Sequence, residues 1–222
     1  MATESPPDVL LAATLCPGLS AERWLPAMAR GEKLGCFGLT EPDFGSNPAG
    51  MTTTATKTDR GYVLNGRKMW IGLATHADVA VVWAKVAGLP GIDPTSPKAI
   101  RGFLVEKGTP GFTPTLIEQK LSMRAALTCR IEFTDCPLPE EALLPASNGL
   151  KSPLLCLNHA RYGIAWGVLG AAAACYDEAR QHALRRIQFG RPLAAFQLVQ
   201  RKLALMATEL TKAQLMAFRL AQ

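Results

Sequence analysis

Two short stretches of this chain combine residue types that could hold a planar ligand with a polar edge. The first, Cys36–Ser46 (CFGLTEPDFGS), is a short apolar run that continues through a Thr-Glu-Pro word into a Gly/Ser turn. The second, Arg67–Leu73 (RKMWIGL), ends a strand-like run with Trp70 and a glycine. A glycine-bearing turn lets the backbone approach a ligand closely, and a strand tryptophan offers a flat aromatic face. The two stretches together predict a platform for a planar cofactor.

Ordinary structural roles would also explain both stretches. Pro42 would fix φ, Asp43 would hydrogen-bond locally, and Gly45 would take a positive φ after a buried strand. Trp70 could be a core residue, because a lone tryptophan in a strand usually packs inside. Residue spacing alone does not choose between these roles and a ligand platform.

The amino-acid sequences of the two stretches resemble the flavin-binding signatures of the acyl-CoA dehydrogenases. The resemblance implies FAD as the cofactor, with its isoalloxazine ring lined by the first stretch and crossed by the tryptophan-bearing strand. The cofactor-binding residues that it implies here are Phe37, Gly38, Leu39, Thr40, Ser46, Trp70, Ile71 and Gly72. Two positions depart from the family: Asn47 stands where the family has Asp, and Gly72 stands where it has Thr or Ser.

A third stretch, Leu154–Arg161 (LLCLNHAR), runs on into YGIAWGVLGA. By itself it predicts an amphipathic helix in which His159 is an ordinary polar residue. Over a long, nearly ungapped run it is also similar to the glutaryl-CoA dehydrogenase branch of the family, where this segment faces the acyl-CoA. The substrate-binding residues that this implies are Ser46, Leu154, Leu155, Cys156, Leu157, Asn158, His159, Ala160 and Arg161.

A fourth stretch, Arg186–Gly190 (RIQFG), is followed by Pro192 and Gln197. Structurally it predicts the end of a helix with a charged cap and a glycine stop. It resembles a family motif whose Arg and Gln contact the diphosphate and adenine of FAD, so Arg186, Phe189 and Gln197 are further cofactor-binding candidates. A planar, permanently charged guanidinium suits a phosphate. A GxGxxG word after a strand is absent, which excludes a Rossmann-type site.

Periodicity predicts the elements that must position these residues. Leu19–Gly31 is expected to be a short helix closed by Gly31, and six or so short strands follow, with Asn65-Gly66 as a two-residue hairpin turn. Further strands are expected at Asp78–Val86, Arg101–Glu106, Gly111–Ile117 and Cys129–Phe133, and long helices at Leu150–Arg186 and Leu193–Gln222. The predicted fold is α+β and acyl-CoA dehydrogenase-like: an antiparallel β-barrel or sandwich, then long antiparallel helices of an incomplete bundle. The predicted domains are a remnant of an N-terminal helical region (1–32), a middle β-domain (33–147) and a truncated C-terminal helical domain (148–222).

Composition narrows the function classes. The chain is 48% hydrophobic with a net charge of +6, and no basic tract is interleaved with aromatics, so nothing supports a nucleic-acid role. No apolar run reaches the roughly 20 residues that a membrane span needs. The six cysteines form no CxxC pair and no Cys/His cluster, which argues against a metal site and favours reduced, mostly buried thiols. The first fifteen residues resemble neither a secretory signal nor a transit peptide. We expect a mitochondrial matrix location in a eukaryote and a cytoplasmic one otherwise.

The resemblance implies an oxidoreductase that removes the α-proton of an acyl thioester while a β-hydride passes to flavin N5. In the glutaryl branch, decarboxylation to crotonyl-CoA follows. Glutaryl-CoA would be the substrate, an electron-transfer flavoprotein the electron acceptor, and a homotetramer the assembly. In that branch, the carboxylate that acts as the base lies in a YEGT-like motif, and this chain lacks such a motif. No catalytic residue is therefore assigned, and neither Glu178 nor Glu209 takes the place of the base. The alternatives are a catalytically inactive FAD- or acyl-CoA-binding paralogue, a fragment acting as an interaction module, or an unstable product.

Overall fold

The computed structural model describes residues 19–222, with side-chain surroundings from residue 22 onward. Most of the predicted N-terminal region, residues 1–32, therefore lies outside the described residues. The chain divides into two compact units, residues 1–159 and 160–222, which we describe separately. Within residues 19–222, no helix is both long and apolar enough to cross a membrane.

The predicted first helix is present as α2 (Leu19–Ala29), and it ends as expected. Gly31 takes a φ of +71° and donates its amide to Met28 O at 3.0 Å, while the next amide reaches Ala27 O at 2.9 Å. A glycine in the left-handed conformation is a common way to satisfy the last carbonyls of a helix. Trp24 and Met28 lie on the buried face of this helix.

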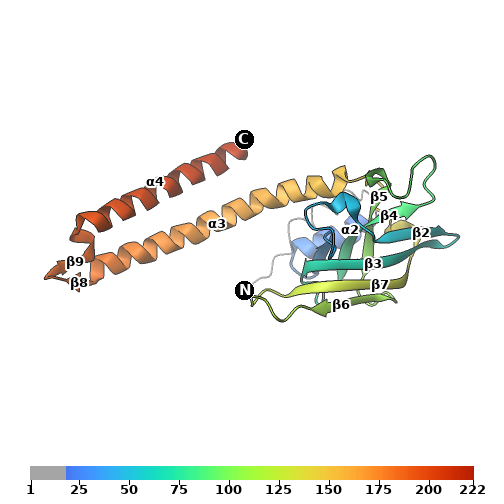
Figure 1. Cartoon of the computed structure of the whole chain (residues 1–222), viewed down its shortest axis with the longest axis horizontal. Helices are drawn as coiled ribbons and strands as arrows, with labels where there is room; N and C mark the ends of the chain where they lie inside the picture. The colour runs from blue at the N-terminus through green and yellow to red at the C-terminus, as the bar shows by residue number, and fades with distance from the viewer. Residues whose placement is uncertain (1–18) are drawn as a thin grey trace. The chain divides into compact units, whose positions relative to one another are not determined.

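The first unit is built on one seven-stranded sheet (Figure 1). Its strands are β1 (Gly35–Gly38), β2 (Thr54–Thr58), β3 (Gly61–Gly72), β4 (Val79–Ala87), β5 (Ile100–Glu106), β6 (Phe112–Leu116) and β7 (Thr128–Leu138). The order across the sheet is β1-β4-β2-β3-β7-β6, and β5 pairs with the other edge of β4. Short 3₁₀ turns punctuate the connections: η1 (Pro48–Gly50), η2 (Pro97–Ala99) and η3 (Glu140–Ala142).

The expectation of purely antiparallel pairing is corrected at β4. This strand runs parallel to β1, with Gly35 opposite Val79, and parallel to β2, with Thr54 opposite Lys85. Its pairing with β5 is antiparallel, as are the β2–β3, β3–β7 and β6–β7 pairings. Parallel neighbours require long connections that return the chain to the same end of the sheet, and the segments between β1 and β4 provide them.

The strand β4 separates two hydrophobic cores. Its side chains alternate, so that Val82 and Val86 face one core with Leu64 and Ile131, while Val81 faces the other. The second core also contains Trp24 and Met28 of α2, Trp83, and Cys156 from the helix that follows the sheet. Because both faces are covered, β4 reads in the sequence as a nearly continuous apolar run.

The predicted hairpin at Asn65-Gly66 is wrong. These residues lie inside the continuous strand β3, at a register shift between β3 and β7, and the actual hairpin joins β2 to β3 at Thr58–Gly61. Gly66 takes a φ of +143°, and an added Cβ there would lie 2.6 Å from the Thr53 Cα. A dipeptide that tolerates positive φ can form a β-bulge as well as a turn.

Both predicted long helices are present. They are α3 (Lys151–Arg185) and α4 (Gln197–Leu220), joined by the small hairpin of β8 (Ile187–Gln188) and β9 (Arg191–Pro192) and by η4 (Leu193–Ala195). The second helix begins later than predicted because Pro192 leads into the 3₁₀ turn η4, and Gln197 follows it. The predicted order of a β-domain followed by long helices is confirmed.

Four of the described cysteines lie in the interior of the fold. Cys36, Cys129, Cys136 and Cys156 are buried and form no disulfide within residues 19–222, and Cys175 is exposed. Burial raises the pKa of Cys36 to about 12 and that of Cys136 to about 11, so these thiols stay protonated and unreactive. Among residues 19–222, no group of three or more His, Cys, Asp or Glu side chains could hold a metal ion.

Candidate functional site

The turn that follows β1 presents polar groups on an accessible stretch of chain. Leu39 is buried in the second core, Thr40 is half-buried and Ser46 is exposed. Glu41 and Phe44 exchange backbone hydrogen bonds of 3.3 Å, which close the turn. Gly45 does not take a positive φ, so this part of the ordinary-turn explanation is wrong.

Trp70 lies at a second irregularity of β3. The register with β7 shifts between Lys68 and Ile71, and Trp70 takes a φ of +64°. A left-handed conformation costs a non-glycine residue about 1–2 kcal/mol, and such strain gathers at functional sites. Trp70 is 57% exposed whereas Ile71 is 3% exposed, so the core interpretation of Trp70 is wrong. The bulge turns the tryptophan ring outward while its neighbour stays in the core.

The two predicted stretches meet directly. The Met69 amide donates to Thr40 O at 2.8 Å, and Lys68 Nζ donates to Leu39 O at 3.1 Å. These contacts place the Leu39–Thr40 backbone beside the strand that carries Trp70. The structure therefore joins residues that are separated by about thirty positions into one site.

A buried ion pair lies behind this junction, and sequence reasoning missed it. Lys68 Nζ lies 2.9 Å from Glu41 Oε1, and the side chains are 0% and 2% exposed. Glu41 Oε1 also accepts from the Thr53 amide and hydroxyl at 3.0 and 2.5 Å, and Oε2 from the Thr52 amide and hydroxyl at 2.6 and 2.8 Å. The signal available was the period of β3, because Lys68 is in phase with the inward-facing Tyr62 and Leu64.

The environment of this pair shifts both pKa values. Burial alone would raise the pKa of Glu41, but the Lys68 charge and the hydrogen bonds from Thr52 and Thr53 outweigh it and lower the pKa to about 2. Burial lowers the pKa of Lys68 to about 8, although Glu41 opposes that change. At pH 7 the pair is therefore a carboxylate and an ammonium held together out of water.

The end of β3 is open at Gly72. No heavy atom lies within 4 Å of the position that a Cβ would take there, and the residue is exposed. Gly72 pairs with Thr128, and the Leu73 amide donates to Leu127 O at 2.7 Å. The loop that leads into β7 is closed by Lys120, whose Nζ donates to Thr128 Oγ1 at 2.8 Å, to Met123 O at 3.0 Å and also to Ala126 O. This loop therefore borders the open end of the tryptophan-bearing strand.

The predicted acyl-CoA segment lies in the first part of α3, and the exposure of its side chains varies from residue to residue. Cys156 is fully buried in the second core, and Leu157 packs against the same core. Leu154 and Leu155 are 37% and 43% exposed, and Asn158 and His159 are also exposed. The ring nitrogen Nδ1 of His159 lies 3.0 Å from Leu155 O, one helical turn back. Of the last two candidates, which belong to the second unit, Ala160 is buried and Arg161 is exposed.

The second unit brings aromatic and basic side chains together at the β8–β9 hairpin. Phe189 and Gly190 have φ values of +52° and +74°, the geometry of a tight two-residue turn, and Phe189 is 93% exposed. Its ring lies 6.2 Å from that of Phe196, and the Arg191 guanidinium lies 4.2 Å from the Phe196 ring centroid. Arg186 and Gln197, the other cofactor candidates, are both exposed.

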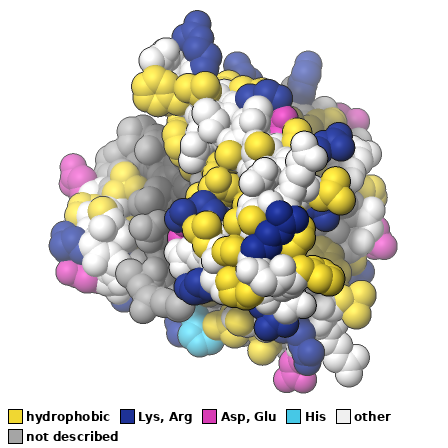
Figure 2. All heavy atoms as spheres, turned by 90° about the vertical axis from the view of Figure 1, so that its left-hand side faces the viewer, with side chains coloured by type: hydrophobic (Ala, Val, Ile, Leu, Met, Phe, Trp, Pro, Cys, Tyr) yellow, Lys and Arg dark blue, Asp and Glu magenta, His cyan; other side chains and the backbone are white. Residues whose placement is uncertain are grey.

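The net positive charge of the chain comes from the second unit. Residues 160–222 contain nine Lys or Arg residues and only three acidic residues, Asp177, Glu178 and Glu209, whereas the preceding residues carry equal numbers of each sign. In the view of Figure 2, Lys and Arg side chains intermingle with hydrophobic ones. A surface of this kind suits an anionic ligand with an apolar or aromatic part.

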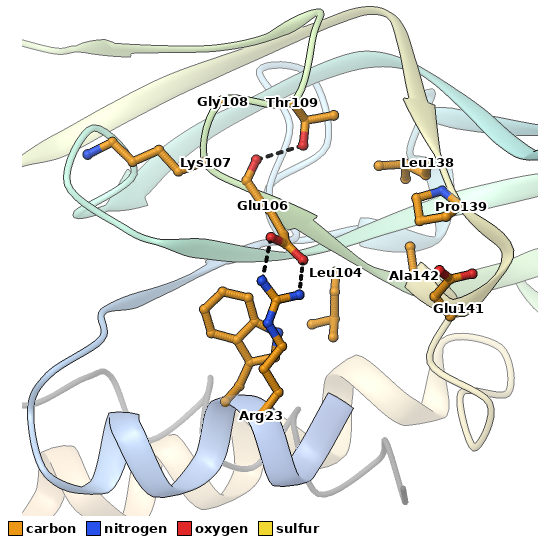
Figure 3. Close-up of a pocket in the computed structure, with 11 residues that line it drawn as sticks. Arg23, Leu104, Glu106, Lys107, Gly108, Thr109, Leu138, Pro139, Glu141 and Ala142 are labelled. Carbon is orange, nitrogen blue, oxygen red and sulfur yellow. Dashed lines mark hydrogen bonds and ion pairs between the residues drawn. The ribbon is translucent and has the colours of Figure 1, made fainter. Parts of the chain in front are cut away.

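A cavity of about 550 Å³ lies elsewhere in the first unit (Figure 3). Arg23 of α2 points into it and forms a two-pronged ion pair with Glu106, with N–O distances of 2.5 and 2.9 Å. Trp24, Leu104 and Glu141 are among its other lining residues. None of the predicted site residues lines this cavity, so it is separate from the junction of the turn and β3.

Comparison with known proteins agrees with the fold. The family described as acyl-CoA dehydrogenase, middle domain, matches residues 36–136, and the one described as acyl-CoA dehydrogenase, C-terminal domain, matches residues 147–222. The isovaleryl-CoA dehydrogenase of Arabidopsis thaliana, named as mitochondrial, is 38% identical over 190 residues, which is 85% of this chain and 45% of that protein.

Solved structures give the same result. A glutaryl-CoA dehydrogenase from Mycobacterium smegmatis, in complex with FADH2, is 44% identical with a TM-score of 0.87, covering 95% of this chain and 52% of that one. The butyryl-CoA dehydrogenase of Megasphaera elsdenii is 34% identical with a TM-score of 0.86, covering 95% and 55%. This chain spans about half the length of these relatives. The two family matches and these relatives place the chain in the acyl-CoA dehydrogenase family, of which it carries the middle domain and the start of the C-terminal domain.

Proposed function

We propose that this chain forms the FAD-binding platform of an acyl-CoA dehydrogenase. The observation that carries the proposal is Trp70: its ring is exposed at a strained bulge, and the same strand is hydrogen-bonded to the Leu39–Thr40 turn. A flat aromatic beside accessible backbone and hydroxyl groups matches a planar ring with a hydrogen-bonding edge. When bound, FAD would supply the hydride acceptor for the oxidation of an acyl thioester.

The residues would divide the binding between them. The backbone of Leu39 and Thr40 and the Thr40 hydroxyl would bind the polar edge of the ring, with Phe37 and Gly38 leading into the turn and Ser46 lying at its far end. Trp70 would cover the ring, and the backbone of Ile71 and Gly72 would pass its edge. Because the Ile71 side chain lies in the core, only its backbone is available to the ligand.

The hairpin of the second unit has candidate contacts of its own for the diphosphate and adenine of FAD. Arg186 carries a permanent charge and can bind a diphosphate with two parallel hydrogen bonds. Phe189 and Gln197 would contact the apolar and polar parts near it. The concentration of positive charge in residues 160–222 supports this assignment.

We further propose glutaryl-CoA as the acyl-CoA substrate. The 44% identity to the glutaryl-CoA dehydrogenase of Mycobacterium smegmatis supports this choice. The exposed residues of the segment, which would contact the acyl-CoA, are Leu154, Leu155, Asn158, His159 and Arg161. Cys156 and Ala160 are buried, so they would shape the backbone of the segment instead of touching the ligand.

The assembly and partners are proposed on the same basis. Electrons would pass to an electron-transfer flavoprotein, and the protein would work as a homo-oligomer, a tetramer. Exposed apolar side chains on α4, such as Leu198, Leu215 and Phe218, are suited to further packing. The mitochondrial name of the Arabidopsis relative supports a matrix location in a eukaryotic source.

A second function is favoured by two departures from the residues that the family has at these positions. Gly72 offers no hydroxyl at a position where the flavin edge would pass, and Asn47 removes a charge near the turn. A protein that binds FAD or an acyl-CoA without oxidising it would tolerate both changes. Glu178 is exposed, and Glu209 is exposed and paired with Lys212 at 2.6 Å, so both have the surroundings of surface charges.

One experiment separates these functions. The purified 222-residue chain is titrated with FAD and its visible spectrum recorded, and glutaryl-CoA, butyryl-CoA and isovaleryl-CoA are then added anaerobically. If glutaryl-CoA bleaches the bound flavin faster than butyryl-CoA and isovaleryl-CoA do, the result would support the proposed dehydrogenase. A yellow protein that no substrate bleaches would favour the binding protein. A folded chain that leaves the FAD spectrum unchanged would overturn both.

A further inference from the structure

The Glu41–Lys68 pair lies behind the junction of the turn and β3, where the flavin ring is proposed to bind. Each carboxylate oxygen of Glu41 accepts at least two hydrogen bonds, so the buried charge is fully satisfied. Lys68 connects the carboxylate to Leu39 O, which is the first backbone carbonyl of the turn. The pair therefore links the turn, the Thr52–Thr53 segment and β3 at one point.

Stability alone is a poor explanation for such a pair. Removing two charges from water costs several kcal/mol per ion, and well-packed apolar replacements of buried pairs are often neutral or stabilising. The pair does fix geometry, because the ammonium and the carboxylate must meet at one distance and in one direction. In some proteins, buried polar groups of this kind select one arrangement among several packings of similar energy.

The geometry in question is the spacing between the turn and Trp70. The Lys68 ammonium and the next amide, that of Met69, bind the consecutive carbonyls of Leu39 and Thr40. Trp70 follows immediately with its positive φ. A strained backbone persists only where its surroundings determine it from several sides, and this pair supplies one of those sides.

Gly66 completes the arrangement on the opposite side. Any side chain there would collide with Thr53, whose hydroxyl lies 2.5 Å from Glu41 Oε1 and 3.3 Å from Arg67 O. The bulge at Gly66 thus lets Thr53 reach both the carboxylate and β3. The three segments are held together by hydrogen bonds that share the buried carboxylate.

We propose that Glu41 and Lys68 are positioning residues that set the distance and angle between the Thr40 edge of the flavin site and the Trp70 ring. Neither side chain reaches the ligand, since both are buried behind the turn. The inference rests on the proposed FAD platform, which it extends from the residues that touch the ring to the pair that places them.

The test uses the full 222-residue chain and a double variant, E41Q/K68M. It removes both charges together and nearly conserves volume, so neither charge is left buried without its partner. The matched control is K57M/E140Q, which removes an exposed Lys–Glu pair from the same unit. If the double variant fails to fold, E41D keeps both charges but withdraws the carboxylate from Lys68.

Two measurements are made on each variant. Hydrogen exchange without ligand measures the exchange rates of the Met69, Thr52 and Thr53 amides. Each of these amides donates a hydrogen bond in the junction. FAD titration reports affinity and the position of the visible absorption bands. For E41Q/K68M we expect a nearly unchanged melting temperature, faster exchange at these amides, FAD affinity reduced about tenfold, and shifted flavin bands.

Unchanged exchange together with unchanged FAD affinity and spectrum in E41Q/K68M would overturn the proposal, as would equal effects in K57M/E140Q. A lower melting temperature with a normal flavin spectrum would assign the pair a stabilising role only, which also contradicts positioning. If the parent chain binds no FAD, the proposed platform fails, and the exchange result alone decides whether the pair holds the junction.

Discussion

At the residue scale, Glu41 makes the fold sensitive to acid. Its pKa falls from an ordinary 4.5 to about 2 in the folded chain, so between these values the unfolded chain binds more protons. The contribution of Glu41 to the free energy of unfolding is therefore fully present above pH 4.5. It decreases as the pH falls towards 2, by on the order of 3 kcal/mol in total. Urea unfolding at steps from pH 6 to pH 2.5 should show this decrease.

The E41Q/K68M variant provides the comparison, because it cannot titrate there and leaves neither charge buried without its partner. The loss of stability on acidification should be smaller in E41Q/K68M than in the parent chain. Equal slopes in the two proteins would show that other carboxylates account for the acid sensitivity.

Gly72 offers a way to test a single missing hydroxyl. A Cβ at this position meets nothing within 4 Å, so Gly72→Ala should be accommodated and should stabilise the chain by roughly 0.5 kcal/mol through the unfolded state. Gly72→Ser adds a hydroxyl to the same Cβ. If the flavin edge passes here, G72S should bind FAD more tightly than G72A or shift its absorption bands.

The comparison of Ser with Ala isolates the hydroxyl from the loss of glycine. Identical FAD affinities and spectra for G72S and G72A would place the flavin edge away from residue 72. The melting temperatures of both variants serve as the control for folding.

At the element scale, the β8–β9 hairpin retains an aromatic residue where backbone energetics favour another. Both turn residues have positive φ, a geometry in which Asn-Gly is preferred to Phe-Gly. Phe189→Asn should therefore stabilise the chain by roughly 0.5–1 kcal/mol in urea unfolding, since the lost ring is 93% exposed. The same variant should weaken FAD binding if Phe189 contacts the cofactor.

The control is Phe189→Ala, which removes the ring but retains the strained conformation. It should weaken FAD binding similarly without the gain in stability. A destabilised F189N would mean that the contact with Phe196 outweighs the relief of strain.

The same scale shows what the sequence could and could not predict. β4, β5 and β6 were predictable because each strand's apolar run or alternation is local, and the positive φ of Gly31 followed from its place after a helix. The parallel pairing of β4 could not be predicted, because it depends on which distant strand becomes its neighbour. The hairpin predicted at Asn65-Gly66 was wrong because this dipeptide permits either a turn or a bulge.

The proposed site could be anticipated from sequence only in its outer residues. The family resemblance made Thr40 and Trp70 candidates, but the exposure of Trp70 depends on a register shift that no local pattern shows. The inward phase of Lys68 was visible in the alternation of β3. Its burial as a charge depends on Glu41, 27 positions earlier, and such a distant partner has no local signature.

At the scale of the whole molecule, the uneven distribution of charge predicts how binding responds to salt. The net charge of +6 arises entirely within residues 160–222. Exposed charges are screened as ionic strength rises, so FAD affinity should fall by roughly threefold or more between 50 and 500 mM NaCl. Fluorescence titration at several salt concentrations measures this.

Riboflavin is the matched control because it has the ring without the phosphates. Its affinity should change little over the same range. An equal dependence for both ligands would indicate that salt acts on the fold and not on phosphate binding.

The buried pair has a kinetic consequence as well. Glu41 and Lys68 come from segments that meet only when the sheet closes around them, so their charges must leave water at that step, before their full attraction is gained. Closure of such non-local contacts is intrinsically slow. We therefore expect E41Q/K68M to refold faster than the parent chain in stopped-flow dilution from urea, and a slower rate would contradict this. The residues that align the site would then also delay the folding of the chain, so that an accurately built platform is one that assembles late.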